Sequence, residues 1–327
     1  MTMKKLSLWI AATLIVCAIV VQKTVAHTEH TEVQNDTIVF MPQWTAQAQF
    51  AGYYVAETMG FYREAGVKVR IEHPSATLSA MERLRRKECH ATTMQLCQAL
   101  DIVDDGMPMV NILQTSMNNA MVIVSARNKN PLTQKGERVG IWSVGFGQLA
   151  MCMSIKDNLN YQWVRFAQNV NLFVAGVLDA TLAMSYNEYY QLMQAGISMN
   201  DQNVYRFCDH GYNIQEDGLY VSREYYEEHR DQAKRFAAAS RKVWEWAAQH
   251  PEETLDIVMK YVERDHVATN RVMQRLMLTE VLRLQVDRES KRREFRLRPD
   301  MVQQVSRLMK ENKMLSREVT YKELIEG

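Results

Sequence analysis

Short apolar segments alternate with longer helical segments over most of the chain. Residues 37–41 are mostly apolar, residues 46–59 have helical spacing, and residues 67–71 alternate apolar and polar side chains. A period of two is typical of a half-buried strand, so residues 67–71 are predicted to form one. Further strands are predicted at residues 90–94, 109–113, 121–124, 139–142, 161–166, 180–184, 204–207 and 218–221, with helices near 78–87, 223–248, 251–263, 266–285 and 299–312. Strands that alternate with helices predict an α/β fold with mainly parallel sheets.

Residues 1–26 have the pattern of a secretory signal peptide. Two lysines precede an apolar run of 16 residues from Leu6 to Val21, and the small residues Thr24 and Ala26 follow it. The run is shorter than the roughly 20 residues that a membrane-spanning helix needs. Cleavage after Ala26 and a periplasmic location are therefore expected. The alternatives are an uncleaved membrane anchor, which would retain the leader, and a lipidated Cys17.

Charge and cysteine content argue against nucleic-acid binding, membrane-surface binding and cysteine-based structural sites. The chain has 39 Lys and Arg against 38 Asp and Glu, and 47% of its residues are hydrophobic. A nearly neutral chain has no strong field for nucleic acid or an anionic membrane surface, so neither is an expected partner. The 5 cysteines are scattered without a CxxC pair. No disulfide framework, structural metal or cofactor is expected.

Four loops that follow predicted strands carry residues suited to binding a small polar ring. Ligands of open α/β sheets bind beyond the carboxyl ends of the strands, so these loops are expected to meet at one cleft. The loops are Gln43-Trp44 with Gln47 and Gln49, Met94-Gln95, Trp142-Ser143, and Tyr186-Asn187-Glu188.

The first of these loops also carries a family resemblance. The run from Trp44 to Ala56, with Gly60-Phe61-Tyr62 and Gly66-Val67 after it, resembles the opening of periplasmic substrate-binding proteins of ABC importers. It is most similar to the subgroup that binds thiamine pyrimidine precursors (formylaminopyrimidine), which is related to the fungal pyrimidine-precursor synthases. The resemblance covers residues 37–285 and continues in Asn171-Leu172-Phe173 with Asp179-Ala180, Ser185-Tyr186-Asn187-Glu188-Tyr189, and Asp209-His210-Gly211-Tyr212-Asn213 with Glu216-Asp217-Gly218.

This resemblance implies a two-lobe periplasmic binding protein of type II, with the ligand buried as the lobes close. Residues 37–125 and 217–327 would form lobe one, and residues 126–216 would form lobe two. Residues 121–125 and 219–222 would be the segments that cross between the lobes. The implied function is capture of a thiamine pyrimidine precursor, or a similar aromatic amine heterocycle, by a monomer that delivers it to an ABC permease in the membrane.

Nine residues are predicted to bind the ligand. Trp44 and Trp142 could stack on a flat ring, and the Glu188 carboxylate could accept two N–H groups side by side. A purely structural role would instead make the tryptophans surface aromatics and Glu188 a helix-capping residue. Two adjacent helical residues diverge by about 100°, so only one of the predicted tyrosines can face the cleft. The nine are Trp44, Gln49, Tyr53, Tyr54, Met94, Trp142, Asn187, Glu188 and His210.

Departures from the family pattern bear on whether the chain is an enzyme. The cysteine-rich iron site of the fungal synthases has no counterpart among the scattered cysteines, which favours a binding protein over an enzyme. A synthase-like enzyme would need a lysine for a pyridoxal cofactor and a sacrificial histidine, and neither can be assigned. Two further hypotheses stay open, a receptor for a sulfonate- or nitrate-type anion and a sensory receptor.

One basic stretch lies outside these motifs. Residues 288–298 interleave arginines and a lysine with acids, which is typical of a solvated face. Contact with the importer is a second interpretation of the same residues.

Overall fold

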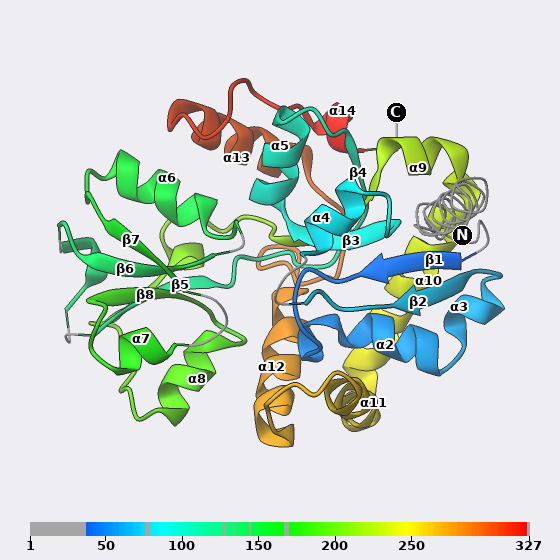
Figure 1. Ribbon diagram of the computed structural model, residues 1–327, viewed down its shortest axis with the longest axis horizontal. Helices are drawn as coiled ribbons and strands as arrows, with labels where there is room; N and C mark the ends of the chain where they lie inside the picture. Colours follow the sequence, from blue (N-terminus) through cyan, green and yellow to red (C-terminus); the bar gives the residue numbers. More distant parts are fainter. Residues whose placement is uncertain are drawn as a thin grey trace, which may run out of the picture. The chain divides into compact units, whose positions relative to one another are not determined.

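Two five-stranded sheets carry the fold (Figure 1). The computed structural model describes residues 37–325 except 76–78, 127–128, 134, 144 and 167–169. The predicted signal peptide therefore lies outside the described residues. The first sheet has the order β2 (Lys68–Ile71), β1 (Thr37–Met41), β3 (Ala91–Gln95), β10 (Asp217–Ser222), β4 (Met109–Gln114), and the second has the order β7 (Gln162–Phe166), β6 (Arg138–Trp142), β8 (Ala180–Met184), β5 (Met121–Ser125), β9 (Val204–Arg206).

Both sheets are mixed, because each contains a strand that runs against its neighbours. In the first sheet β10 pairs antiparallel with β3 and β4, and in the second β5 pairs antiparallel with β8 and β9. The pairs β1–β3, β6–β7 and β6–β8 are parallel, as the alternation predicts. Parallel strands end at the same edge of their sheet, so the loops that follow them lie together.

Helices pack around both sheets. In Figure 1, α5 and α9 lie near β4 at the top of the first sheet and α2 and α11 lie below that sheet, while α6 lies above the second sheet and α7 and α8 lie below it. This layering is that of an α/β fold, as predicted. The helices are α2 (Ala51–Thr58), α3 (Phe61–Glu64), α4 (Ala80–Arg85), α5 (Leu96–Asp104), α6 (Gln148–Lys156), α7 (Asn171–Val174), α8 (Glu188–Gln194), α9 (Arg223–Glu228), α10 (Arg230–Gln249), α11 (Pro251–Arg264), α12 (Arg271–Leu284), α13 (Pro299–Glu311) and α14 (Tyr321–Leu324), with 3-10 turns η1 (Ala48–Phe50), η2 (Pro131–Thr133) and η3 (Phe207–Asp209).

Local signals explain where the long C-terminal helices begin. Pro251 and Pro299 open α11 and α13, where a missing backbone N–H costs nothing. Asn270 caps α12, because its side-chain oxygen accepts a 2.9 Å hydrogen bond from the backbone N–H of Met273. α12 in turn packs against η1 and α11, so this helix lies beside the loop that follows β1.

The segments that join the two sheets are not the ones expected. Residues 121–125 form the fully buried β5, an inner strand of the second sheet, and residues 217–222 form β10, an inner strand of the first. The expected lobe boundary at residue 125 is therefore too late, because a strand belongs with the partners that satisfy its backbone. Residues 115–120 and 207–216 connect the sheets instead.

Close packing under the first sheet depends on one glycine. Gly52 lies on the buried face of α2, directly against the indole of Trp244 on α10. A Cβ atom at position 52 would lie 2.4 Å from Cδ2 of Trp244. Trp244 is 1% exposed and also contacts Tyr53, so α2 and α10 share one aromatic core.

Candidate functional site

A small cavity lies where the loops after β1, β3, β6 and β8 meet. Its volume is about 30 Å³, enough for one or two water molecules. This convergence agrees with the prediction made from the place of these loops at strand ends. The lining residues are Gln43, Trp44, Gln47, Gln49, Gln95, Trp142, Phe146, Met184, Tyr186, Asn187 and Glu188. Five of the nine predicted site residues are therefore brought together: Trp44, Gln49, Trp142, Asn187 and Glu188.

Glu188 is buried at the start of α8, and protein donors already occupy its carboxylate. Oε1 accepts hydrogen bonds from Nε1 of Trp142 at 3.0 Å and from Nδ2 of Asn187 at 3.2 Å, and Oε2 accepts one from the backbone N–H of Met184 at 2.9 Å. Burial raises the pKa of Glu188, and these donors oppose the rise. The carboxylate thus fixes the Trp142 indole and the end of β8. This structural role differs from the helix capping considered from the sequence.

Asp217, at the start of β10, organises the polar wall of the cavity. Its two oxygens accept hydrogen bonds from Nε2 of Gln43 at 3.0 Å and from Nε2 of Gln49 at 2.5 Å, while Nε2 of Gln47 donates to Oε1 of Gln49 at 2.6 Å. Burial raises the pKa of Asp217, and the two glutamines oppose the rise. An ionised carboxylate only accepts, so with Asp217 ionised each of the two amides turns its nitrogen toward it.

That arrangement leaves one acceptor without a partner. The Oε1 atom of Gln43 is buried and makes no hydrogen bond to any described residue. A buried carbonyl oxygen without a donor costs free energy, and a donor placed in this cavity would offset that cost. Sequence reasoning named the loop but not this atom, because Asp217 is distant in the chain from Gln43 and Gln49.

His73 holds the loop after β1 in place without lining the cavity, and sequence reasoning missed it. Its Nδ1 lies 2.6 Å from the carbonyl oxygen of Trp44, which can only accept, so Nδ1 carries the proton. Its Nε2 then accepts from the hydroxyl of Tyr54 at 2.8 Å, and that hydroxyl accepts from the backbone N–H of Gln47. Burial lowers the pKa of His73 to about 4, so the ring is neutral near pH 7.

Both predicted tyrosines lie in the core and do not line the cavity. Tyr53 packs edge-on against Trp244, with ring centroids 5.8 Å apart. Tyr54 stacks on Tyr261 at 4.0 Å and supports His73. Neither of the pair lines this cavity, because α10 and α11 both pack against this helix.

Met94 and His210 are also not in the lining. Met94 is 1% exposed within β3, and the neighbouring residue Gln95 reaches the cavity instead, because successive strand residues point to opposite faces. His210 is exposed and stacks on Tyr205 at 4.3 Å in the segment that joins the sheets.

Comparison with known protein families gives a match to the family described as "NMT1/THI5 like". The model of that family matches residues 47–254, well over half of the chain. This chain is a member of the NMT1/THI5-like family. A comparison with curated protein sequences finds no significant match.

Solved structures match the fold of this NMT1/THI5-like protein over most of its length. The ligand-binding component of an ABC-type import system from Staphylococcus aureus, solved with zinc bound, is 10% identical, with 89% of this chain and 96% of that chain covered and a TM-score of 0.67. The periplasmic aliphatic sulphonate-binding protein SsuA from Escherichia coli is 13% identical, with coverages of 89% and 97% and a TM-score of 0.63. The alkanesulfonate-binding protein SsuA from Xanthomonas axonopodis, bound to MOPS, is 10% identical, with coverages of 87% and 96% and a TM-score of 0.64. The fold is that of a type II periplasmic binding protein.

One aromatic residue in the NMT1/THI5-like site was not foreseen from sequence. Phe146 lies edge-on to both tryptophans, with ring centroids 5.7 Å from Trp44 and 6.4 Å from Trp142. It is carried by the loop between β6 and α6, where Gly145 and Gly147 have φ of 78° and 98°. Positive φ values favour glycine, and these two glycines were the available signal in the sequence.

Two further observations concern the described part of the chain as a whole. No helix within it is long and apolar enough to cross a membrane. Within the same residues, no group of three or more His, Cys, Asp or Glu could hold a metal ion.

Cys89 is buried at the junction before β3, and burial raises the pKa of its thiol to about 12, which suits a structural role.

Proposed function

We propose that this protein is the extracytoplasmic solute-binding component of an ABC importer, and that its cavity captures a thiamine pyrimidine precursor or a similar aromatic amine heterocycle. Membership of the NMT1/THI5-like family and the periplasmic-binding-protein fold support the binding role. The ABC permease would be its partner in the membrane. The exported chain would act as a monomer.

One observation carries the choice of ligand. Asp217 holds the Gln43 amide so that its buried Oε1 has no partner among the described residues, in the same lining as Trp44 and Trp142. A flat ring between the tryptophans with an N–H aimed at Gln43 would satisfy that acceptor, while the indoles supply the faces. Glu188 then acts by holding Trp142, and its oxygens are not needed by the ligand.

The charge of the lining supports a heterocycle over an anion. No Lys, Arg or His belongs to the described residues that line the cavity. Among these lining residues, the carboxylate is that of Glu188. A sulfonate or nitrate would meet a buried carboxylate without a cation, which is costly. A pyridoxal-dependent synthase would need a lysine at this position.

The size of the cavity implies movement. About 30 Å³ cannot contain a six-membered ring with substituents. We infer that residues 37–120 and 217–325 act as one lobe and residues 121–206 as the other, and that the ligand enters when they separate. Residues 115–120 and 207–216 would be the hinges, since they connect the two sheets.

Calorimetry tests the ligand. The parent protein is titrated with an aminopyrimidine, with formylaminopyrimidine and with an alkanesulfonate. We expect the pyrimidines to bind and the sulfonate not to displace a bound pyrimidine. Gln43→Ala should weaken pyrimidine binding by about 5- to 150-fold, because a donor of the ligand loses its acceptor. Gln303→Ala, an exposed glutamine on α13, is the matched control and should bind as the parent does.

Each outcome distinguishes one hypothesis from the rest. Displacement of a bound pyrimidine by the sulfonate would overturn the pyrimidine assignment and leave only the importer role. Imine absorbance and product formation after incubation with pyridoxal phosphate and iron would identify an enzyme instead. Unchanged pyrimidine affinity in Gln43→Ala would remove Gln43 from the site.

A further inference from the structure

A second, larger cavity lies beside β5 and β9 of the second sheet. Its volume is about 340 Å³, and it shares no lining residue with the first cavity. Three arginines line it from separate segments: Arg206 from β9, Arg283 from α12, and Arg288 from the loop after α12. Guanidinium groups gathered round one cavity are typical of an anion site.

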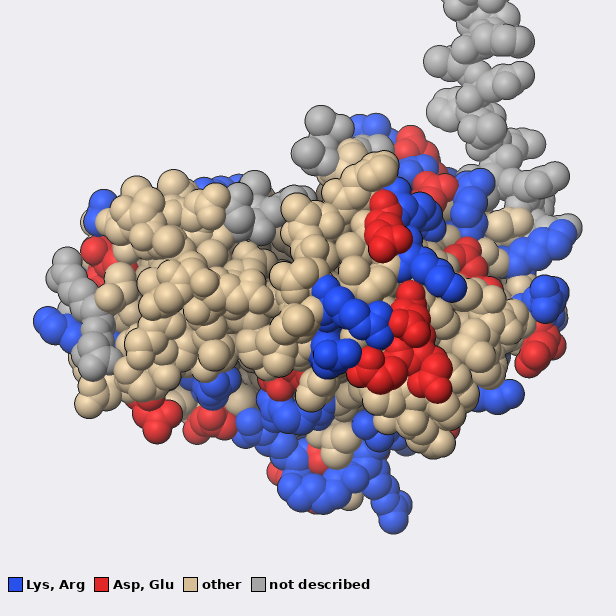
Figure 2. Space-filling view, turned by 90° about the horizontal axis from the view of Figure 1, so that it is seen from below, with Lys and Arg blue, Asp and Glu red and all other residues tan. Residues whose placement is uncertain are grey.

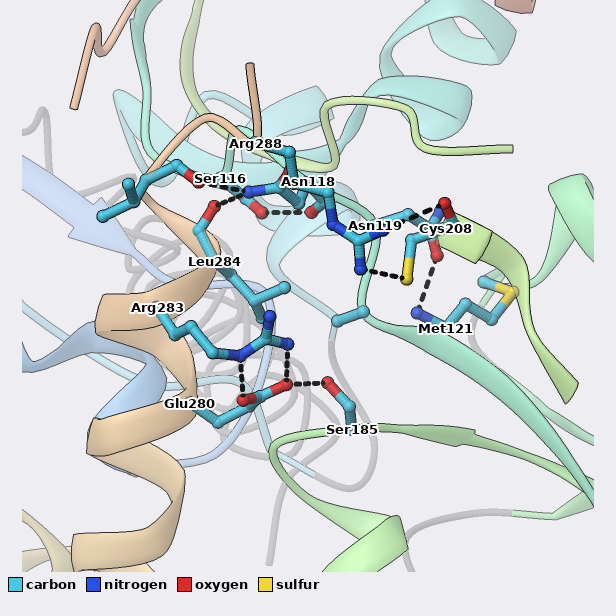
Figure 3. Close-up of polar contacts among 12 residues, drawn as sticks. Ser116, Asn118, Asn119, Met121, Ser185, Cys208, Glu280, Arg283, Leu284 and Arg288 are labelled. Carbon is cyan, nitrogen blue, oxygen red and sulfur yellow. Dashed lines mark hydrogen bonds and ion pairs between the residues drawn. The ribbon is translucent and has the colours of Figure 1, made fainter. Parts of the chain in front are cut away.

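Arg283 reaches the cavity with part of its guanidinium unused. Its Nε and Nη2 donate to the Glu280 carboxylate at 2.7 and 2.6 Å, and Ser185 donates to the same carboxylate at 2.7 Å. Figure 3 shows this carboxylate between the guanidinium and the hydroxyl. The bonds hold the side chain in place, while Nη1 of Arg283 makes no hydrogen bond to the described residues.

Arg288 is fixed in a similar way from the following loop. Its Nη1 donates to Oδ1 of Asp209 at 2.8 Å. Its Nη2 lies 3.0 Å from Sγ of Cys208 (Figure 3). The ion pair lowers the pKa of Asp209 against the effect of its partial burial. Nε of Arg288 makes no hydrogen bond to the described residues, so this guanidinium also retains a free donor.

Arg206 is the least compensated of the three. Its guanidinium carbon lies 5.0 Å from the ring centroid of Tyr189, and no ion pair joins it to a carboxylate among the described residues. Asn119 lines the same cavity and is 1% exposed, and its Nδ2 has no partner within the described chain. The charge of Arg206 also acts on Glu280 and Asp209 from beyond ion-pair distance. A cation without an ion-pair partner and a buried donor without an acceptor would both be satisfied by an anionic oxygen.

Other exposed arginines of α12 contrast with this group. Figure 2 shows basic side chains gathered near the middle of the face seen from below, with acidic side chains beside them. On α12, Arg271 pairs with Glu252 and Asp256, and Arg275 pairs with Glu252. At the cavity, by comparison, the carboxylates that face the three arginines within the described residues are Glu280 and Asp209, which leaves a net positive charge among these five side chains.

We infer that this cavity binds a small tetrahedral oxyanion of the phosphate and sulfate class. Its oxygens would accept from the free donors of Arg206, Arg283 and Arg288. Arg206 belongs to the second sheet and Arg283 to α12, which packs against η1 of the first sheet region, so the bound anion bridges the two parts. By linkage, the anion favours whichever arrangement of the two parts brings these arginines together.

Calorimetry with sodium sulfate, and separately with sodium phosphate, tests the inference at an ionic strength held constant with sodium chloride. We expect saturable binding at one site, and the tighter of the two salts identifies the anion. Arg206→Gln and Arg283→Gln should each weaken it by about tenfold or more, because a charged donor is lost. Arg275→Gln, on the same helix but paired with Glu252, should bind as the parent does. Absence of saturable heat with both salts, or equal loss in Arg275→Gln, overturns the inference.

A second measurement locates the anion without any variant. Cys208 lines the cavity and contacts Arg288, whereas Cys89, Cys97 and Cys152 are buried. Sulfate should slow the reaction of Cys208 with iodoacetamide, which peptide mass spectrometry measures at this residue. The sulfate concentration that gives half of the protection should equal the dissociation constant from calorimetry. Sodium chloride at equal ionic strength should not slow the reaction. Sulfate binding without protection of Cys208 would place the anion elsewhere and refute the inference.

Discussion

Gly52→Ala should destabilise the protein through one crowded contact. The added Cβ would lie 2.4, 2.5 and 2.8 Å from three ring atoms of Trp244, against an ordinary contact distance of 3.4–4 Å. The backbone of Gly52 is not in the left-handed region, so space alone is at issue. α2 and α10 would have to separate by about 1 Å in a core that is close-packed.

The magnitude follows from two opposing effects. Replacing glycine by alanine inside a helix stabilises it by about 0.5–1 kcal/mol when there is room. Overpacking of this kind costs about 1–3 kcal/mol, and here backbone and ring must both move. We therefore expect a net loss of about 1–2 kcal/mol in the free energy of unfolding. Because Gly52 follows Gln49 by one turn, the shift should also disturb the bond from Gln49 to Asp217.

Urea denaturation of the ligand-free protein measures the effect. With a slope of about 3 kcal/mol per molar urea, the midpoint should fall by roughly 0.3–0.7 M. In a Trp244→Leu background, where the ring is absent, Gly52→Ala should cost nothing or stabilise, so the two changes are coupled. A Gly52→Ala protein at least as stable as the parent, with no coupling to position 244, would refute the packing argument.

Three more measurements bear on the site and its surroundings. Burial and the nearby Asp217 raise the pKa of Glu216 well above its ordinary value, so its contribution to stability is full below the unfolded pKa of about 4.3 and is lost as pH rises through the folded value. Glu216→Gln keeps an acceptor for the backbone N–H of Ala120. The urea midpoint of this variant should exceed that of the parent by a difference that grows between about pH 5 and pH 8, and a difference that is constant with pH would contradict this. Glu188→Ala should shift the indole N–H resonance of Trp142 upfield and weaken ligand binding, whereas an unmoved resonance would mean that the carboxylate does not hold the ring. X-ray scattering should show a smaller radius of gyration with ligand than without, and tight binding without compaction would exclude hinge closure.

Sequence periodicity predicted the strands well because each strand is short and most are buried on at least one face. The segment 37–41 coincides with β1, and 180–184 coincides with β8. Pairing was harder to foresee, because it depends on which distant backbone satisfies each N–H and C=O group. β5 follows β4 closely in the chain and yet lies in the other sheet, which local pattern alone does not reveal.

For the candidate site, the sequence likewise predicted which residues lie together better than it predicted what each of them contacts. Trp44, Trp142 and Glu188 were predicted to be near one another from their position after strands, and they line one cavity. Their roles depend on contacts between distant parts of the chain, such as the hydrogen bond from Trp142 to Glu188. His73 lacked any signal, since a histidine after a strand is ordinary until its ring is found against the Trp44 carbonyl.

The place of β10 has a consequence for how the chain is made. The second sheet is complete once residue 206 has been synthesised, because its strands run from β5 to β9 without interruption. The first sheet is not, since β10 must insert between β3 and β4, whose facing edges stay unpaired until residue 217 and those after it are available. Exposed strand edges are prone to pairing with other chains, and such non-local insertion is slow. A nascent or truncated chain that ends before β10 would therefore carry one finished sheet and two unpaired strand edges, with Gln43 and Gln49 still lacking the carboxylate that orders them.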